Sequence, residues 1–154
     1  MSRLSTYARA AAVAAFVLLA PASAARAQTA VIVHPSAPLA DASVETLRRY
    51  FLGKSATLGS SRVEVVEYVK ARNAFYRSLL GLSEDEVRRR WVALAFRGEV
   101  QSVPLELTDP VAVRRYVAAH PGVIGFVDVA TVDPSVKVLT VGGHRPGDAG
   151  YPLH

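Results

Sequence analysis

The chain has 154 residues, no cysteine, and 18 basic against 13 acidic side chains, which gives a formal net charge of +5. The absence of cysteine excludes disulfides, thiolate metal sites and lipid attachment through a thiol. Three of the arginines lie in residues 1–27, so residues 28–154 carry a net charge of only about +2 and give no support for nucleic-acid binding.

Residues 1–27 have the pattern of a secretory signal peptide. A short basic start precedes an apolar run over residues 10–20, and Ala25-Arg26-Ala27 places small residues where a signal peptidase reads. The uncharged stretch is shorter than the roughly 20 residues that a membrane-spanning helix needs, which favours cleavage over anchoring. We therefore expect cleavage before Gln28, with a second possible site after Ala24. The destination is the periplasm, or the outside of a cell with one membrane.

Residues 28–141 are expected to form one α/β domain. Short β-branched runs predict strands at 30–34, 63–69, 123–127 and 136–141. Helices are predicted from an Asp41 or Ser43 cap to Gly53, over 73–80, after Ser83, and from Thr108 or Asp109 to His120. This alternation favours an α/β layer fold with a mixed, mostly parallel sheet. Residues 142–154 are rich in Gly and Pro and predict a flexible C-terminal tail.

The helix after Ser83 has the clearest local signals. Ser83 and Glu86 have the spacing of a capping box, in which each side chain bonds the backbone of the other. Trp91 shares an apolar stripe with Val87 and Leu94, so we expect its indole in the core.

The chain carries no motif that predicts an enzyme. It has no Gly-x-Ser-x-Gly nucleophile elbow, no phosphate-binding loop and no dinucleotide fingerprint. None of its histidines (34, 120, 144 and 154) is paired at metal-ligand spacing, so we expect neither a metal nor a cofactor.

Anion binding is the remaining chemistry. Arg72 and Asn73 stand at the start of a predicted helix after a strand, where free backbone N–H groups and the helix dipole favour a negative ligand. Arg97 follows the next helix, in a loop that could face the same crevice. The alternative is that both arginines are solvated loop residues, which is the ordinary state of arginine.

Four segments in order carry a resemblance to a known family. Residues 31–39 and 47–54 resemble a strand and an Asn-Pro loop that lead into a helix ending in Ile-Phe-x-Gly-Lys. Ala74-Phe-Tyr with Leu79-Leu-Gly resembles a helix that follows a ligand loop, and 121–128 is similar to a Pro-Gly-Ala-Ile-Gly-Tyr-Val segment. The family is that of the phosphate-type periplasmic substrate-binding proteins of ABC transporters, with a type II binding-protein fold.

The resemblance covers residues 30–141 and implies a single three-layer lobe, in which helices flank the mixed, mostly parallel sheet. Members of the family have two lobes with the anion between them, and this chain resembles the second lobe alone. Where the family has a Ser-Gly-Thr turn that donates to phosphate, this chain has Val69-Lys-Ala-Arg-Asn73. The resemblance implies that Lys70, Arg72 and the helix N-terminus could attract an anion, although the hydroxyl groups are missing.

Two hypotheses follow for the function. The first is an exported, non-enzymatic solute-binding-like lobe that binds phosphate or another small oxyanion and has a membrane permease or envelope protein as its partner. The alternative is a ligand-free interaction module that docks onto an envelope receptor or sensor protein. In either case a homodimer could rebuild a two-sided cleft.

Overall fold

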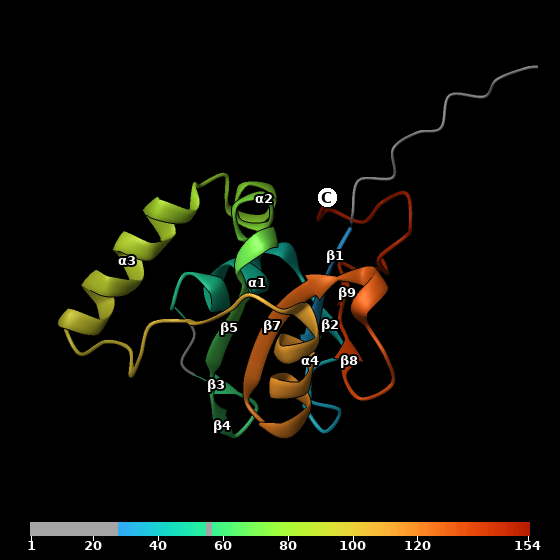
Figure 1. Ribbon diagram of the computed structural model, residues 1–154, viewed down its shortest axis with the longest axis horizontal. Helices are drawn as coiled ribbons and strands as arrows, with labels where there is room; N and C mark the ends of the chain where they lie inside the picture. Colours follow the sequence, from blue (N-terminus) through green and yellow to red (C-terminus); the bar gives the residue numbers. More distant parts are fainter. Residues whose placement is uncertain (1–27, 55–56) are drawn as a thin grey trace, which may run out of the picture.

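The computed structural model describes residues 28–54 and 57–154, and the predicted signal peptide lies outside the described residues. The centre of the fold is a five-stranded sheet in the order β6-β5-β7-β1-β8 (Figure 1). Its strands are β1 (Thr29–Val33), β5 (Glu64–Tyr68), β6 (Leu105–Leu107), β7 (Val123–Asp128) and β8 (Lys137–Val138). β1 pairs antiparallel with β7 and β8, whereas β5 pairs parallel with β6 and β7. Only β1 runs against the others, so the predicted mixed, mostly parallel sheet is confirmed.

Helices cover both faces of the sheet. They are α1 (Val44–Phe51), α2 (Val69–Leu80), α3 (Glu84–Phe96) and α4 (Pro110–Ala119), with a 3-10 turn at Val129–Thr131. Gly125 of β7 faces Val117 of α4, and the next residue, Phe126, points to the opposite face. There it meets Phe51 of α1 and Phe75 of α2. This layering confirms the predicted three-layer α/β architecture, while α3 lies beside α2 and extends away from the sheet (Figure 1).

Two short strand pairs complete the structure. β2 (Asp41–Ala42) pairs parallel with β9 (Thr140–Val141), and β3 (Thr57–Leu58) forms a hairpin with β4 (Ser61–Arg62). The strand predicted over 136–141 is therefore split in two. The physical reason is that β8 pairs with β1 of the main sheet, whereas β9 leaves that sheet to pair with β2.

The C-terminal segment differs from the flexible tail predicted for residues 142–154. Tyr151 and Leu153 are each 1% exposed and belong to the core. The Tyr151 hydroxyl donates to the Thr29 carbonyl at 2.8 Å, and the Ser78 hydroxyl donates to the Pro152 carbonyl at 3.1 Å. The two apolar side chains near the end of the chain hold the segment against the domain.

No helix in the described part of the chain is long and apolar enough to cross a lipid bilayer.

Candidate functional site

The helix that carries three of the predicted site residues begins earlier than predicted. α2 starts at Val69, directly after β5, and not at Asn73. Lys70 and Ala71 are good helix formers, and no Gly or Pro separates the strand from the helix. Arg72 and Asn73 therefore lie past the free backbone N–H groups of the first turn. Lys70 lies within that turn, and both Lys70 and Asn73 are exposed.

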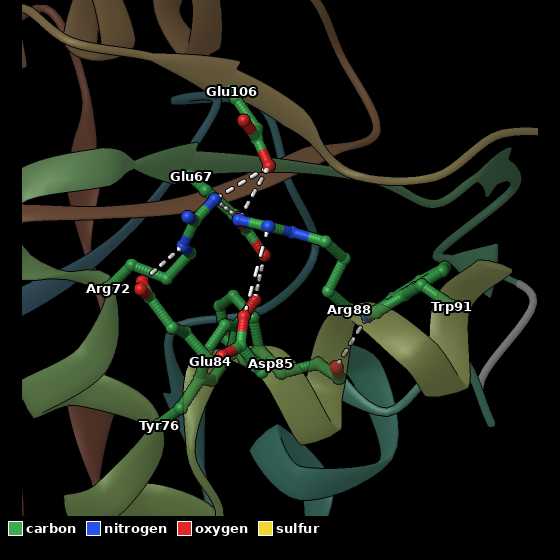
Figure 2. A network of polar contacts seen from close by, with 9 residues as sticks. Glu67, Arg72, Tyr76, Glu84, Asp85, Arg88, Trp91 and Glu106 are labelled. Carbon is green, nitrogen blue, oxygen red and sulfur yellow. Dashed lines mark hydrogen bonds and ion pairs between the residues drawn. The ribbon is translucent and has the colours of Figure 1, made fainter.

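Arg72 is buried at the centre of a group of three carboxylates, of which Glu67 is buried and Glu84 and Glu106 are partly exposed (Figure 2). Its guanidinium nitrogens lie 3.1 Å from Glu67 of β5, 2.9 Å from Glu84 of α3 and 2.6 Å from Glu106 of β6. Arg72 is 5% exposed and Glu67 is 4% exposed. We call Arg72 and these three glutamates the Arg72 cluster. It joins two helices and two strands.

Burial and ion pairing together shift the pKa values of Arg72, Glu67 and the neighbouring Tyr76. Desolvation raises the pKa of Glu67, although hydrogen bonds from Tyr76 and Arg72 act in the opposite direction. Burial also raises the pKa of the Tyr76 hydroxyl, and the neighbouring Glu67 charge adds to that shift. For Arg72, burial by itself lowers the pKa, but its bonds to Glu84 and Glu67 outweigh this effect, so its pKa is raised and it stays charged.

The local charge opposes an anionic ligand at Arg72. Three carboxylates surround Arg72, and the guanidinium of Arg88 lies 3.7 Å from one of them, Glu106 (Figure 2). Arg72 already donates to all three carboxylates. An oxyanion at this position would have to displace one of them and would meet the like charge of the others. The geometry therefore gives Arg72 a structural task, which is to tie α2 and α3 to the sheet.

Arg97 is not brought to Arg72. It is the C-cap of α3 and pairs with the exposed Glu99. Arg72 contacts Glu84, which is the first residue of the same helix. A helix of 13 residues is about 20 Å long, so the two arginines belong to opposite ends of α3. The crevice predicted between them is not formed.

The start of α2 retains the features of an anion site. Its N-cap, Tyr68, makes no side-chain capping bond, and the first turn has no acidic residue. The start of α4 differs, because Asp109 caps it by accepting from the Val111 backbone N–H at 3.0 Å. Burial raises the pKa of the Tyr68 hydroxyl, and the charges of Asp128 and Asp109 add to the shift. The helix N-terminus is thus uncapped, but the charges of Asp128 and Asp109 act on its N-cap residue and would oppose an anion there.

The carboxylates around Arg72 were missed from the sequence. Glu67 stands between Val66 and Tyr68, in the buried part of β5. A charged residue at a buried strand position needs a partner, and this signal alone could have marked Glu67 as part of a pair. The described residues contain no group of three His, Cys, Asp or Glu side chains that could hold a metal ion.

The raised pKa of Glu67 predicts a pH dependence of stability. A carboxyl group whose pKa is higher in the folded than in the unfolded protein binds its proton more tightly when folded. Its contribution to the free energy of unfolding is therefore largest below the unfolded pKa and falls as pH rises through the window above it. We expect urea unfolding to show the native protein losing stability relative to Glu67→Gln as pH rises above about 4.5, the ordinary pKa of a glutamate. A change in the opposite direction would mean that the ion pair with Arg72 outweighs burial.

Comparison with known proteins finds similarity in structure only. No family model matches the chain, and no curated protein matches it. Among solved structures, it is similar to an ABC-type phosphate transport receptor from Vibrio cholerae, with 17% identity and a TM-score of 0.61. It is also similar to a putative phosphate ABC transporter substrate-binding protein with bound phosphate from Clostridium perfringens, with 20% identity and a TM-score of 0.62.

The matches cover 77% of this chain but only 48% and 46% of those two proteins. A phosphate-binding protein from Stenotrophomonas maltophilia is similar to this chain in the same way, with 18% identity and a TM-score of 0.57. That match covers 78% of this chain and 40% of the other protein. The chain thus spans about half the length of the solved structures that it matches. The resemblance seen in the sequence motifs is confirmed at the level of the fold, in a single-lobe version.

Proposed function

We propose that this protein is an exported, periplasmic and non-enzymatic single lobe of the solute-binding fold that acts by docking onto an envelope protein. The observation that carries the proposal is an exposed apolar patch on α3. Phe96 is 93% exposed, Val92 is 55% exposed and Val103, in the loop after α3, is 45% exposed. Contiguous exposed apolar surface on a soluble domain marks an interaction site.

The three side chains form one surface. Val92 and Phe96 are four residues apart on α3 and so lie on the same side of the helix. Val92 and Val103 line the same small cavity of about 160 Å³, next to the Arg72 cluster. We call these three residues the α3 patch. The Arg72 cluster also supports the proposal. Among the predicted anion-site residues, Arg72 is the only buried cation, and its guanidinium is already paired with three carboxylates.

Photo-crosslinking in the native cell tests the docking proposal. A photoreactive amino acid at position 96 is expected to yield an adduct with one membrane-associated envelope protein. The same amino acid in place of Arg115, which is exposed on α4, is the matched control and should yield no such adduct. A Phe96→Asp variant should fail to compete with the native protein for the partner.

Three results would contradict the docking proposal. They are an absence of adducts at position 96, identical adducts from both positions, or an adduct only with a second copy of this chain, which would indicate a homodimer instead.

Export is tested separately on the same cells. Processed protein that begins at Gln28 should be found in the periplasmic fraction, and retention of the full-length chain in the cytoplasm would contradict export.

A second candidate function is the binding of a small oxyanion at the start of α2. It is favoured by the uncapped first turn and by Lys70, which is exposed and has no ion-pair partner among the described residues. Two of the similar structures are named as phosphate proteins of ABC transporters, so a permease would be the partner in this case. Backbone N–H groups, Lys70 and the exposed Asn73 amide would then hold the anion.

Calorimetric titration with phosphate, with sulfate as a comparison, tests the second candidate. Saturable binding is expected to weaken in Lys70→Gln and to stay unchanged in Arg77→Gln, an equal charge change at an exposed position farther along α2. An absence of heat at millimolar phosphate, or an equal effect of both variants, would contradict it.

A further inference from the structure

A second pocket, of about 790 Å³, shares Trp91 with the small cavity beside the Arg72 cluster, but it is lined by no residue of that cluster, of the α3 patch or of the start of α2. It is enclosed by the loop after α1, the amino end of β5, α3 and the loop after α3. β5 enters the pocket at Glu64 and ends at Tyr68, where α2 begins. Val65 also lines the pocket and lies three residues before Tyr68, so about 10 Å of strand separates the pocket from the start of α2. It is therefore separate from the anion site considered there.

Three basic side chains line the pocket: Lys54, Arg62 and Arg90. None of them has an ion-pair partner among the described residues. Arg90 donates from Nε to the Leu52 carbonyl at 3.0 Å, which positions its guanidinium at the wall. Two acidic residues also line the pocket, of which only Glu99 has a cationic partner in the described part of the chain, so three basic groups face one unpaired carboxylate, that of Glu64. Glu64 accepts from the Tyr116 hydroxyl at 2.7 Å, and Glu99 pairs with Arg97.

Part of the wall is apolar and fixed in place. Trp91 and Leu94 of α3 line the pocket together with Val65 of β5. The Trp91 indole N–H donates to the Phe51 carbonyl at 3.0 Å, so its polar atom is satisfied and its ring is held. Gly53 lies against both side chains: a Cβ atom there would come within 2.8 Å of Leu94 Cδ1 and 3.2 Å of the Trp91 ring. This close approach holds α3 in the position that forms the pocket.

We propose that this pocket binds an organic carboxylate with an apolar body, of the aliphatic or aromatic class. The carboxylate would pair with Arg62 and Arg90, with Lys54 nearby, and the apolar body would lie against Trp91 and Leu94. The volume falls within the range of about 300 to 1,000 Å³ that is typical of small-molecule sites. Inorganic phosphate would leave the apolar wall uncovered, and a neutral apolar molecule would leave the basic groups unpaired.

The single tryptophan of the chain makes the proposal directly measurable, because all indole fluorescence comes from Trp91. The processed protein should show a saturable change in Trp91 emission with octanoate and with 3-phenylpropionate. Octanol, which has the same apolar body without the charge, is expected to bind at least about tenfold more weakly, since a charged hydrogen bond contributes about 1.5–3 kcal/mol. Inorganic phosphate should give no saturable change.

Charge-matched variants identify the site. Arg90→Gln and Arg62→Gln are each expected to weaken octanoate binding about tenfold or more. Arg89→Gln is the control, because Arg89 is the exposed neighbour of Arg90 on α3 and does not line the pocket. It should change the affinity less than about twofold. Arg62→Gln keeps the test valid if Arg90→Gln fails to fold, since Arg62 is exposed and its side chain makes no hydrogen bond or ion pair among the described residues.

Equal binding of octanol and octanoate would overturn the proposal, as would an equal effect of Arg89→Gln and Arg90→Gln. Absence of any saturable response would do the same. None of these results bears on the docking proposal or on oxyanion binding, because Phe96 and Lys70 do not line this pocket.

Discussion

Replacement of Arg72 by Met is expected to lower the free energy of unfolding by about 3–5 kcal/mol, because it leaves the buried Glu67 carboxylate without its cation. Arg72 is 5% exposed and donates to three carboxylates, and Glu67 is 4% exposed. Removal of one partner of a buried ion pair leaves a charge that water cannot reach. The measurement is urea unfolding of the variant and the native protein, at one pH near neutrality.

The control for this prediction is Arg88→Met, on the exposed side of the same network. The Arg88 side chain is 50% exposed and lies 3.7 Å from Glu106, and a pair of this kind contributes at most about 1 kcal/mol. The double variant Arg72→Met with Glu67→Met should recover much of the lost stability, because an apolar pair of similar volume can replace a buried ion pair. A loss of unfolding free energy below about 1 kcal/mol in Arg72→Met would contradict the structural role of Arg72. This residue would then again be a candidate for anion binding.

Phe126→Ala is expected to cost about 3–5 kcal/mol, the range for loss of a large aromatic side chain from a core. Phe126 has no exposed surface. Its ring stacks on Phe75 with centroids 4.0 Å apart and meets Phe51 edge-on at 5.9 Å. The substitution would leave a cavity between the sheet and two helices, which the surrounding rings can fill only in part.

Phe96→Ala is the matched control, because it removes the same side chain from a position that is 93% exposed. Its unfolding free energy should stay within about 0.5 kcal/mol of the native value. The two variants also separate stability from docking, since Phe96→Ala should fold normally and lose contact with the partner. A large loss of stability in Phe96→Ala would mean that the α3 patch is covered within the folded protein.

The elements that the sequence predicted well are those with local signals. Ser83 and Glu86 form the predicted capping box, in which the Ser83 backbone N–H donates to the Glu86 carboxylate at 2.7 Å. Trp91 is buried with Val87 and Leu94, as the helical stripe indicated. These features depend on residues within one or two turns of each other, so the order of amino acids alone carries them.

Short or conformationally plain segments were harder to predict. β6 has only three residues, Leu105–Leu107, and it was missed because such a run has no periodicity to detect. The first turn of α2 was missed because no capping residue or proline marks its start. The packed end of the chain depends on Tyr151, whose burial follows from its contact with β1 and not from its Gly- and Pro-rich surroundings.

The composition and periodicity of the chain determined an α/β lobe with helices on both faces of a mixed sheet, because burial of apolar stripes permits few other arrangements. The task of Arg72 was decided by tertiary structure alone. Its partners Glu84 and Glu106 lie 12 and 34 residues away in the sequence, and they meet it only because α3 and β6 pack beside α2 and β5. A free arginine and a paired one have the same sequence signature, and the difference lies in which carboxylates the fold brings within hydrogen-bonding distance.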